Sequence, residues 1–184
     1  KVFDALGGSS PNVYFCPIAA AVGGAAGTDT ITFVGAATTA GTMFFSIAGD
    51  LYQLSVTVGM TAVQQAAALV ALLTSDVNCA VTAAIGGTGS EHIVTVTSKD
   101  LSIAAGEIRV LYNPSGTVQS NLNPSGTAVT IASEYLTSAA GAPVVSTIFT
   151  TSGGTDNLGD KWFTFITCPF TDSTTLAAYK AASV

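Results

Sequence analysis

The residues that could do chemistry in this chain are few and lie far apart. His92 is the single histidine, and the three cysteines, Cys16, Cys79 and Cys168, form no CxxC pair. A structural zinc site uses four cysteine or histidine ligands at short spacing, which this chain does not offer. Glu91 precedes His92, but neighbours on a strand point to opposite faces and form no dyad. We therefore expect no metal and no cofactor, with His92 at the surface.

The remaining polar residues also lack a catalytic pattern. Asp156, Asp160 and Asp172 flank one apolar run, which leaves a weak cation site open, although turn and cap roles suit aspartates better. No Gly-x-Ser-x-Gly elbow is present for a nucleophilic serine, and no Gly-x-x-x-x-Gly-Lys loop is present for phosphates. The sequence predicts no catalytic residues, and we expect that the protein is not an enzyme.

The composition is apolar and poor in charge. Hydrophobic residues make up 48% of the 184 residues and charged residues 9%, with a net charge of −6. No basic run exists, so nucleic acid is not expected as a partner. The longest apolar stretch, Ala66–Leu73, is too short to cross a membrane. A surface with so little charge repulsion favours packing into an assembly, although a secreted β protein shares this composition.

The chain reads as an internal piece of a longer protein made in a reducing compartment. Residues 1–8 resemble the last turns of a helix with a glycine C-cap, and no signal peptide pattern is present. Three cysteines without CxxC spacing argue against a disulfide framework. We expect all three to remain thiols.

Two apolar runs that end in Cys-Pro indicate the domain organisation. They are Val13–Ile18 and Phe163–Phe170, and unbroken apolar runs are typical of strands buried on both faces of a parallel sheet. We expect them to be parallel neighbours, with Cys16 and Cys168 at equivalent heights. The fold class predicted is α+β: residues 1–28 and 151–184 form part of a discontinuous α/β core. Residues 29–150 form an inserted β-rich domain, a β-sandwich or mixed sheet with one packed helix.

The insert shows a regular alternation of strands with one clear helix. A hairpin is expected over residues 42–48 and 52–58, with Gly49-Asp50 as its turn and Leu54, Val56 and Val58 on one face. Thr61 and Gln64 predict a capping box for a helix that ends near residues 74–76. Its apolar stripe is expected at Val63, Ala66, Ala67, Val70 and Leu73, widened by Leu69 and Leu72. Further strands are expected at residues 30–34, 79–84, 93–97, 107–112, 128–132 and 144–150, and a last helix from Thr171.

Two local features need tertiary partners. The sequence Asn-Pro-Ser-Gly-Thr occurs at residues 113–117 and again at residues 123–127, and its turn chemistry fits hairpin corners. Arg109 is the only arginine, and an ion pair with Glu107 is the expected structural use.

The order of the pieces resembles the tail sheath proteins of Mu-like contractile-tail phages. Residues 41–112 resemble the inserted domain of that family, through Ala40-Gly41-Thr42, the helix from Thr61, and the strands at residues 93–99 and 107–110. The end of the chain is also similar, through Gly153-Gly154-Thr155-Asp156-Asn157 and Pro169-Phe170-Thr171-Asp172. The loop at residues 101–106 and the long Ser/Pro-rich region at residues 113–144 depart from the family pattern.

This resemblance implies a structural virion protein without an active site. Such subunits assemble with copies of themselves around the tail tube protein, in the host cytoplasm, and contract to drive genome delivery. The regions that link neighbouring subunits in the family lie outside this chain, which leaves a monomeric state open for the chain on its own. The alternative is a secreted β-sandwich binding module, an adhesin or carbohydrate-binding domain. Trp162, at the start of an expected buried strand, speaks against a sugar site there.

Overall fold

The computed structural model describes residues 23–114, 122–142 and 173–182. The expected core strands at residues 13–18 and 163–170, the strand at residues 144–150, and the pair Cys16 and Cys168 lie outside the described residues. The division into a core and an inserted domain therefore stays a prediction.

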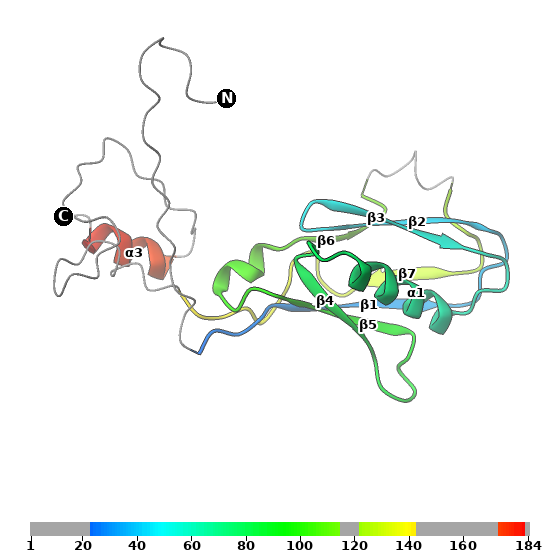
Figure 1. The fold of residues 1–184 in the computed structure, drawn as a ribbon, viewed down its shortest axis with the longest axis horizontal. Coiled ribbons are helices and arrows are strands. Elements are labelled where there is room, and N and C mark those ends of the chain that lie inside the picture. Colours follow the sequence, from blue (N-terminus) through cyan, green and yellow to red (C-terminus); the bar gives the residue numbers. More distant parts are fainter. Residues whose placement is uncertain (1–22, 115–121, 143–172, 183–184) are drawn as a thin grey trace, which may run out of the picture.

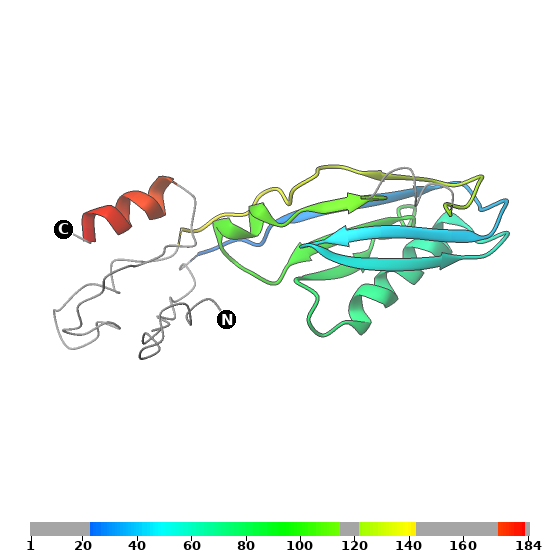
Figure 2. The ribbon, with the colours of Figure 1, turned by 90° about the horizontal axis from the view of Figure 1, so that it is seen from above.

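The described chain folds into two antiparallel sheets that face each other (Figures 1 and 2). The four-stranded sheet has the order β4-β5-β1-β7, formed by β1 (Thr28–Val34), β4 (Val81–Ile85), β5 (Ile93–Ser98) and β7 (Ala128–Ile131). The three-stranded sheet has the order β3-β2-β6, formed by β2 (Gly41–Ile47), β3 (Asp50–Val56) and β6 (Val110–Tyr112). Helix α1 (Ala62–Ser75) packs with the sheets, whereas α3 (Ser173–Ala182) lies apart from them in both views. This confirms the α+β class with one packed helix.

The two sheets are connected to each other along one side, and α1 lies between them along the other side. After β7 the chain crosses to the second sheet, where the Val110 amide donates to the Glu134 carbonyl at 2.8 Å and the Leu136 amide to the Ile108 carbonyl at 3.0 Å. On the opposite side, α1 contacts both edge strands, β3 and β4. The body thus consists of two sheets that are connected beyond β7 and β6, with α1 packed between the edge strands β3 and β4 on the other side.

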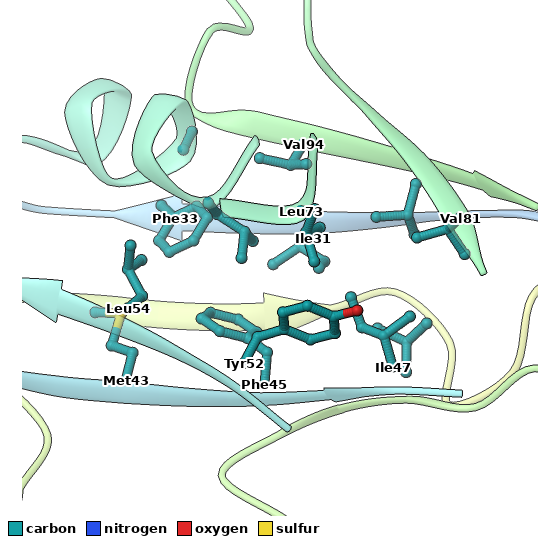
Figure 3. Packing of buried hydrophobic residues seen from close by; sticks show 14 of the residues in the cluster. Ile31, Phe33, Met43, Phe45, Ile47, Tyr52, Leu54, Leu73, Val81 and Val94 are labelled. Carbon is teal, nitrogen blue, oxygen red and sulfur yellow. The ribbon is translucent and has the colours of Figure 1, made fainter. Parts of the chain in front are cut away.

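Alternating side chains of both sheets build one hydrophobic core (Figure 3). In β1 the inward residues are Asp29, Ile31 and Phe33, and the threonines between them face outward. In β2 the inward residues Met43, Phe45 and Ile47 are all buried. Phe45 contacts Phe33 across the two sheets, with ring centroids 6.1 Å apart.

The β2–β3 hairpin is confirmed, but its expected turn is wrong by one residue. Ile47 pairs with Asp50, so the turn residues are Ala48 and Gly49. Both have positive φ, 54° and 94°, which matches the type I′ turn that two-residue hairpins prefer. The inward face of β3 is Tyr52, Leu54 and Val56. Val58 lies beyond the strand and is 66% exposed, which corrects the expected face.

Helix α1 has the expected boundaries, and only part of its expected apolar stripe is buried. The Gln64 amide donates to Thr61 Oγ1 at 3.3 Å and the Thr61 amide to Gln64 Oε1 at 2.9 Å, which confirms the capping box. The buried residues are Gln65, Ala66, Leu69 and Leu73. Val63 and Ala67 are exposed, and Val70 is half-buried. The apolar pattern correctly predicted Ala66, Leu69 and Leu73. It wrongly included Val63 and Ala67, because most positions in this helix are apolar or alanine and hydrophobicity alone barely distinguishes one face.

Replacing Thr61 with alanine should lower the free energy of unfolding by about 1 kcal/mol, because the capping box loses its hydroxyl acceptor. Urea denaturation followed by far-ultraviolet circular dichroism would measure this change. Thr74→Ala, at an exposed position in the last turn of the same helix, is the control and should have a smaller effect. Equal effects of the two substitutions would show that the capping box does not stabilise this protein.

Two expected strands are shorter than the sequence suggested. Residues 103–107 form a short 3-10 helix, and β6 follows only at Val110–Tyr112. The strand expected from Cys79 begins at Val81. Strand β6 pairs with β2 and β7 pairs with β1, so β6 and β7 do not form a hairpin with each other. Residues 115–117 of the first Asn-Pro-Ser-Gly-Thr segment lie outside the described residues. In the part of the chain that the structure describes, no helix has the length and apolar character needed to span a membrane.

Candidate functional site

The single histidine is half-buried and is the last residue of the loop between β4 and β5. The His92 carbonyl accepts from the Phe33 amide at 3.0 Å, and Glu91 Oε2 accepts from the Gly89 amide at 2.9 Å. Hydrogen bonds from backbone amides, its own and that of Gly89, lower the pKa of Glu91. Residues 23–114, 122–142 and 173–182 hold no group of three or more His, Cys, Asp or Glu placed to bind a metal ion. Asp156, Asp160 and Asp172 lie outside those ranges.

A cluster of the buried residues Tyr52 and Cys79 with the partly exposed Asp76 connects β3 to the end of α1. The Tyr52 hydroxyl donates to Asp76 Oδ2 at 2.8 Å, and the Asn78 amide donates to Asp76 Oδ1 at 2.9 Å. The hydrogen bond from Tyr52 is the largest cause of the lowered pKa of Asp76. Burial raises the pKa of Tyr52, and its hydrogen bonds with Cys79 and Asp76 add to that rise. Cys79 is a free thiol that is only 1% exposed, so it has little access to a reagent or ligand.

A second polar cluster holds the start of α1 against the start of β7. Gln65 is completely buried, and its Nε2 donates to the Met60 carbonyl at 2.8 Å. Its Oε1 accepts from Thr127 Oγ1 at 2.8 Å. Because the buried amide has partners for both its nitrogen and its oxygen, it is tolerated in the core and joins two distant segments. Sequence periodicity offers no signal for this role, since glutamine belongs by type to the polar face.

Asp29 is a buried carboxyl group at the entrance of β1. It is 5% exposed, and its Oδ1 accepts from the Thr30 amide at 2.7 Å and the Ser133 amide at 3.1 Å. Its Oδ2 is buried and has no hydrogen-bond partner in the described structure. Burial therefore raises the pKa of Asp29, and the two backbone hydrogen bonds offset part of that rise.

The buried Asp29 carboxyl predicts a pH dependence that Asp29→Asn should remove. Since the folded pKa is raised, the folded protein binds this proton more tightly than the unfolded chain does. The stabilising contribution is complete below the ordinary aspartate pKa of about 3.9 and is lost as pH rises through the raised value. The unfolding free energy of the wild type minus that of Asp29→Asn should therefore fall as pH increases. Urea titrations across this range would measure it, and a constant difference would contradict a raised pKa.

Arg109 forms its ion pair with Glu134, not with the expected Glu107. The two side chains are 53% and 48% exposed, so the pair contributes little to stability. Arg109 and Glu134 meet because the chain after β7 runs antiparallel to the segment before β6, with a bridge between Arg109 and Tyr135. Because Arg109 and Glu134 are 25 residues apart in the chain, local sequence patterns give no signal for this ion pair.

Three loops meet at one end of the body and form a surface that we call the uncharged tip: residues 34–41, 57–63 and 122–128. The Ala37 amide donates to the Met60 carbonyl at 3.0 Å, and the Thr38 amide donates to the Ser125 carbonyl at 2.7 Å. None of the three loops contains an ionisable residue. A shallow depression of about 380 Å³ lies on this end, lined by Phe33, Val34, Ala36, Thr61, Val63 and His92.

No polar cluster described above has the arrangement of a catalytic site, and comparisons with known proteins point to a structural class. No family model matches the chain. The chain is 30% identical over 173 residues to the Mu-like prophage FluMu tail sheath protein of Haemophilus influenzae. This alignment covers 94% of the chain and 32% of that relative, so the chain spans about a third of the relative's length.

Proposed function

We propose that this chain is part of a structural subunit of a contractile phage tail sheath, which assembles around a tail tube and contracts to drive genome delivery. The observation that carries the proposal is the similarity to a tail sheath protein over 94% of the chain. The alignment is long enough to include both sheets and helix α1, so the similarity is not confined to one motif. It also agrees with the sequence pattern that resembles this family.

The use of polar groups in the body supports a structural role. The side chains of Gln65, Asp76 and Tyr52 form hydrogen bonds that connect different elements of the fold. Cys79 is buried, and in the described ranges His92 belongs to no group of three or more His, Cys, Asp or Glu residues that could hold a metal ion. A catalytic site needs a nucleophile or base within hydrogen-bond reach of a partner, in a place that substrate can enter. We therefore propose that the chain performs no catalysis and holds no cofactor.

The paired segments at the base of the body support the proposal that residues 29–150 are an inserted domain. Ala25 and Ala140 exchange two backbone hydrogen bonds, of 2.9 and 3.1 Å, and Thr28 and Thr137 exchange two more. The chain therefore enters and leaves the two sheets side by side, as an insertion into another domain requires. Residues 1–28 and 151–184 would then contribute to that α/β core.

The proposed partners follow from the sheath role. They are other copies of the same protein and the tail tube protein, in the tail of a virion that is assembled in the host bacterial cytoplasm. Nucleic acid and membrane are not proposed as partners. A secreted sugar-binding module has less support, because Tyr135 is the only exposed large aromatic side chain in the described ranges, and stacking on sugars requires exposed aromatic rings.

Antibodies raised against this chain test the proposal on phage particles from the bacterium that encodes it. Gold-labelled antibodies viewed by electron microscopy should mark the tail along its whole length, with many copies per particle. The control is serum depleted on the purified chain, which should leave the tails unlabelled. Label confined to capsids or fibres, or absent from purified contractile particles, would contradict the sheath assignment.

A further inference from the structure

The ionisable side chains of the two-sheet body are concentrated at the end opposite the uncharged tip. Asp50 lies at the hairpin turn, at the far end of β2 from Gly41. Asp76 caps the end of α1, at the far end of the helix from Thr61. Asp29 is the second residue of β1, whose last residue, Val34, belongs to the tip.

The other charged residues follow the same division. Lys99 and Asp100 come after β5, whose first residue pairs with Thr32 close to the tip. The Arg109 carbonyl accepts from the Ala48 amide in the hairpin turn, so the ion pair with Glu134 also lies at the charged end. A seven-residue strand spans about 23 Å, which exceeds the screening length of about 8 Å at physiological salt. The tip is therefore electrically separated from most of the charge, with Glu91 and His92 at its border.

The tip exposes apolar side chains on a rigid support. Val34 is 56% exposed, Val58 66%, Val63 46% and Leu122 53%. The Ser125 amide donates to Thr39 Oγ1 at 2.8 Å, in addition to the bonds already described between the loops. A Cβ on Gly126, which has φ of 80°, would lie 2.7 Å from the Ala36 carbonyl oxygen, so these loops pack at backbone distance. A preorganised surface loses little conformational entropy when it binds.

A second uncharged surface covers the outer side of the four-stranded sheet. We call it the threonine face, and its members share the outward position on neighbouring strands: Thr28, Thr30, Thr32, Thr82, Thr95, Thr97 and Thr130. Thr30 pairs with Thr95, Thr28 with Thr97, and Thr32 with Thr130. None of the outward residues of these four strands is charged. Outer faces of soluble sheets ordinarily carry lysine and glutamate, and their absence favours contact with another uncharged surface.

We propose that the uncharged tip of one copy of this chain packs against the threonine face of a second copy, so that copies join head to tail. Two chains of net charge −6 repel each other wherever charged surfaces meet, and this pairing uses the two surfaces where that repulsion is least. Because the tip and the face are different surfaces of one body, the contact is heterologous and can repeat into a ring or an open helical array. The inference deepens the proposed function, on which self-association rests, by naming the two surfaces through which copies meet; a chain that stays monomeric would overturn this pairing and leave the sheath assignment to the labelling of phage tails.

Sedimentation velocity of the whole 184-residue chain tests the proposal. Between about 10 µM and 1 mM, a range that detects weak association, the mean sedimentation coefficient should rise with concentration. The rise should be larger at about 0.5 M than at about 0.05 M NaCl, because salt screens the repulsion between acidic chains and leaves apolar contact intact. A chain that stays monomeric up to about 1 mM at both salt concentrations would overturn the proposal.

Two pairs of matched variants locate the contact, each adding one negative charge at an exposed or partly exposed position. Val58→Asp in the tip should weaken association at least about tenfold, the effect of about 1.4 kcal/mol, whereas Val77→Asp, at an 85% exposed site near the end of α1, should change it less than about twofold. Thr95→Glu in the threonine face should also weaken association about tenfold, whereas Gln53→Glu, on the outer side of β3, should not. Circular dichroism melting curves verify that all four variants fold.

Mixing the two interface variants distinguishes head-to-tail contact from other arrangements. Val58→Asp retains an intact threonine face and Thr95→Glu retains an intact tip, so an equimolar mixture should form dimers and nothing larger. A loss caused by Val58→Asp but not by Thr95→Glu would indicate tip-to-tip contact and would overturn the proposed pairing. Equal losses from the interface variants and their controls would show that net charge, and not a specific surface, governs association.

Discussion

Leu69→Asp should abolish folding of the two-sheet body. Leu69 is completely buried on the inner face of α1, where the helix fills the open side between β3 and β4. Leu→Ala substitutions in cores cost about 2–5 kcal/mol, and an unpaired buried charge adds to this loss. Since whole domains are stable by only about 5–15 kcal/mol, the variant should have no cooperative melting transition. Circular dichroism and differential scanning calorimetry would measure this.

Ala67→Asp is the control for the Leu69 substitution. Ala67 lies in the same helix but is exposed, so its replacement should lower stability only slightly. Val70→Asp should have an intermediate effect because Val70 is half-buried against the core. If Leu69→Asp melts at the same temperature as Ala67→Asp, then α1 does not pack against the sheets as described.

Phe45→Ala should destabilise the protein by about 3–5 kcal/mol, the range for removing a buried aromatic side chain. Phe45 of β2 is fully buried, with its ring centroid 6.1 Å from that of Phe33 and 5.4 Å from that of Tyr112. The truncation leaves a cavity between the two sheets that rigid strands cannot close. The midpoint of urea denaturation should fall, with little change in its slope.

Leu51→Ala provides the matched control for Phe45→Ala. Leu51 lies on the neighbouring strand β3 and is 48% exposed, so the loss of its side chain should change the midpoint far less. Similar losses for the two variants would mean that the sheets do not share one core.

Local sequence signals predicted the elements of this fold better than their exact alignment. The capping box located the start of α1, because side-chain capping depends only on residues within one turn. The hairpin was predicted, but its turn lies at Ala48-Gly49 and not at Gly49-Asp50. The first turn residue is Ala48, which has a positive φ although it is not glycine. The predicted buried face of α1 included Ala66, Leu69 and Leu73 but missed Gln65, which is buried through hydrogen bonds to Met60 and Thr127 that no hydrophobic pattern can report.

The polar contacts of the candidate site and the two proposed contact surfaces depend on segments that are distant in sequence. Arg109 pairs with Glu134, and Asp29 accepts from the Ser133 amide, only because the chain after β7 returns along both sheets. The small number of charged residues was evident in the composition. That most of them lie at one end of the body became evident only from the three-dimensional arrangement. The tip is assembled from three separate loops, and the threonine face from four strands whose order differs from their order in the chain.

Cryo-electron microscopy of an isolated contractile tail, with helical reconstruction of the sheath, tests the central claim most directly. The proposal predicts that each sheath subunit contains the body described here, with sheets β4-β5-β1-β7 and β3-β2-β6 and helix α1 between their open edges. It also predicts that side-chain density around Phe33, Phe45 and Leu69 matches this sequence. A sheath density that cannot accommodate this body, or one whose subunits are built from a different chain of the same phage, would contradict it.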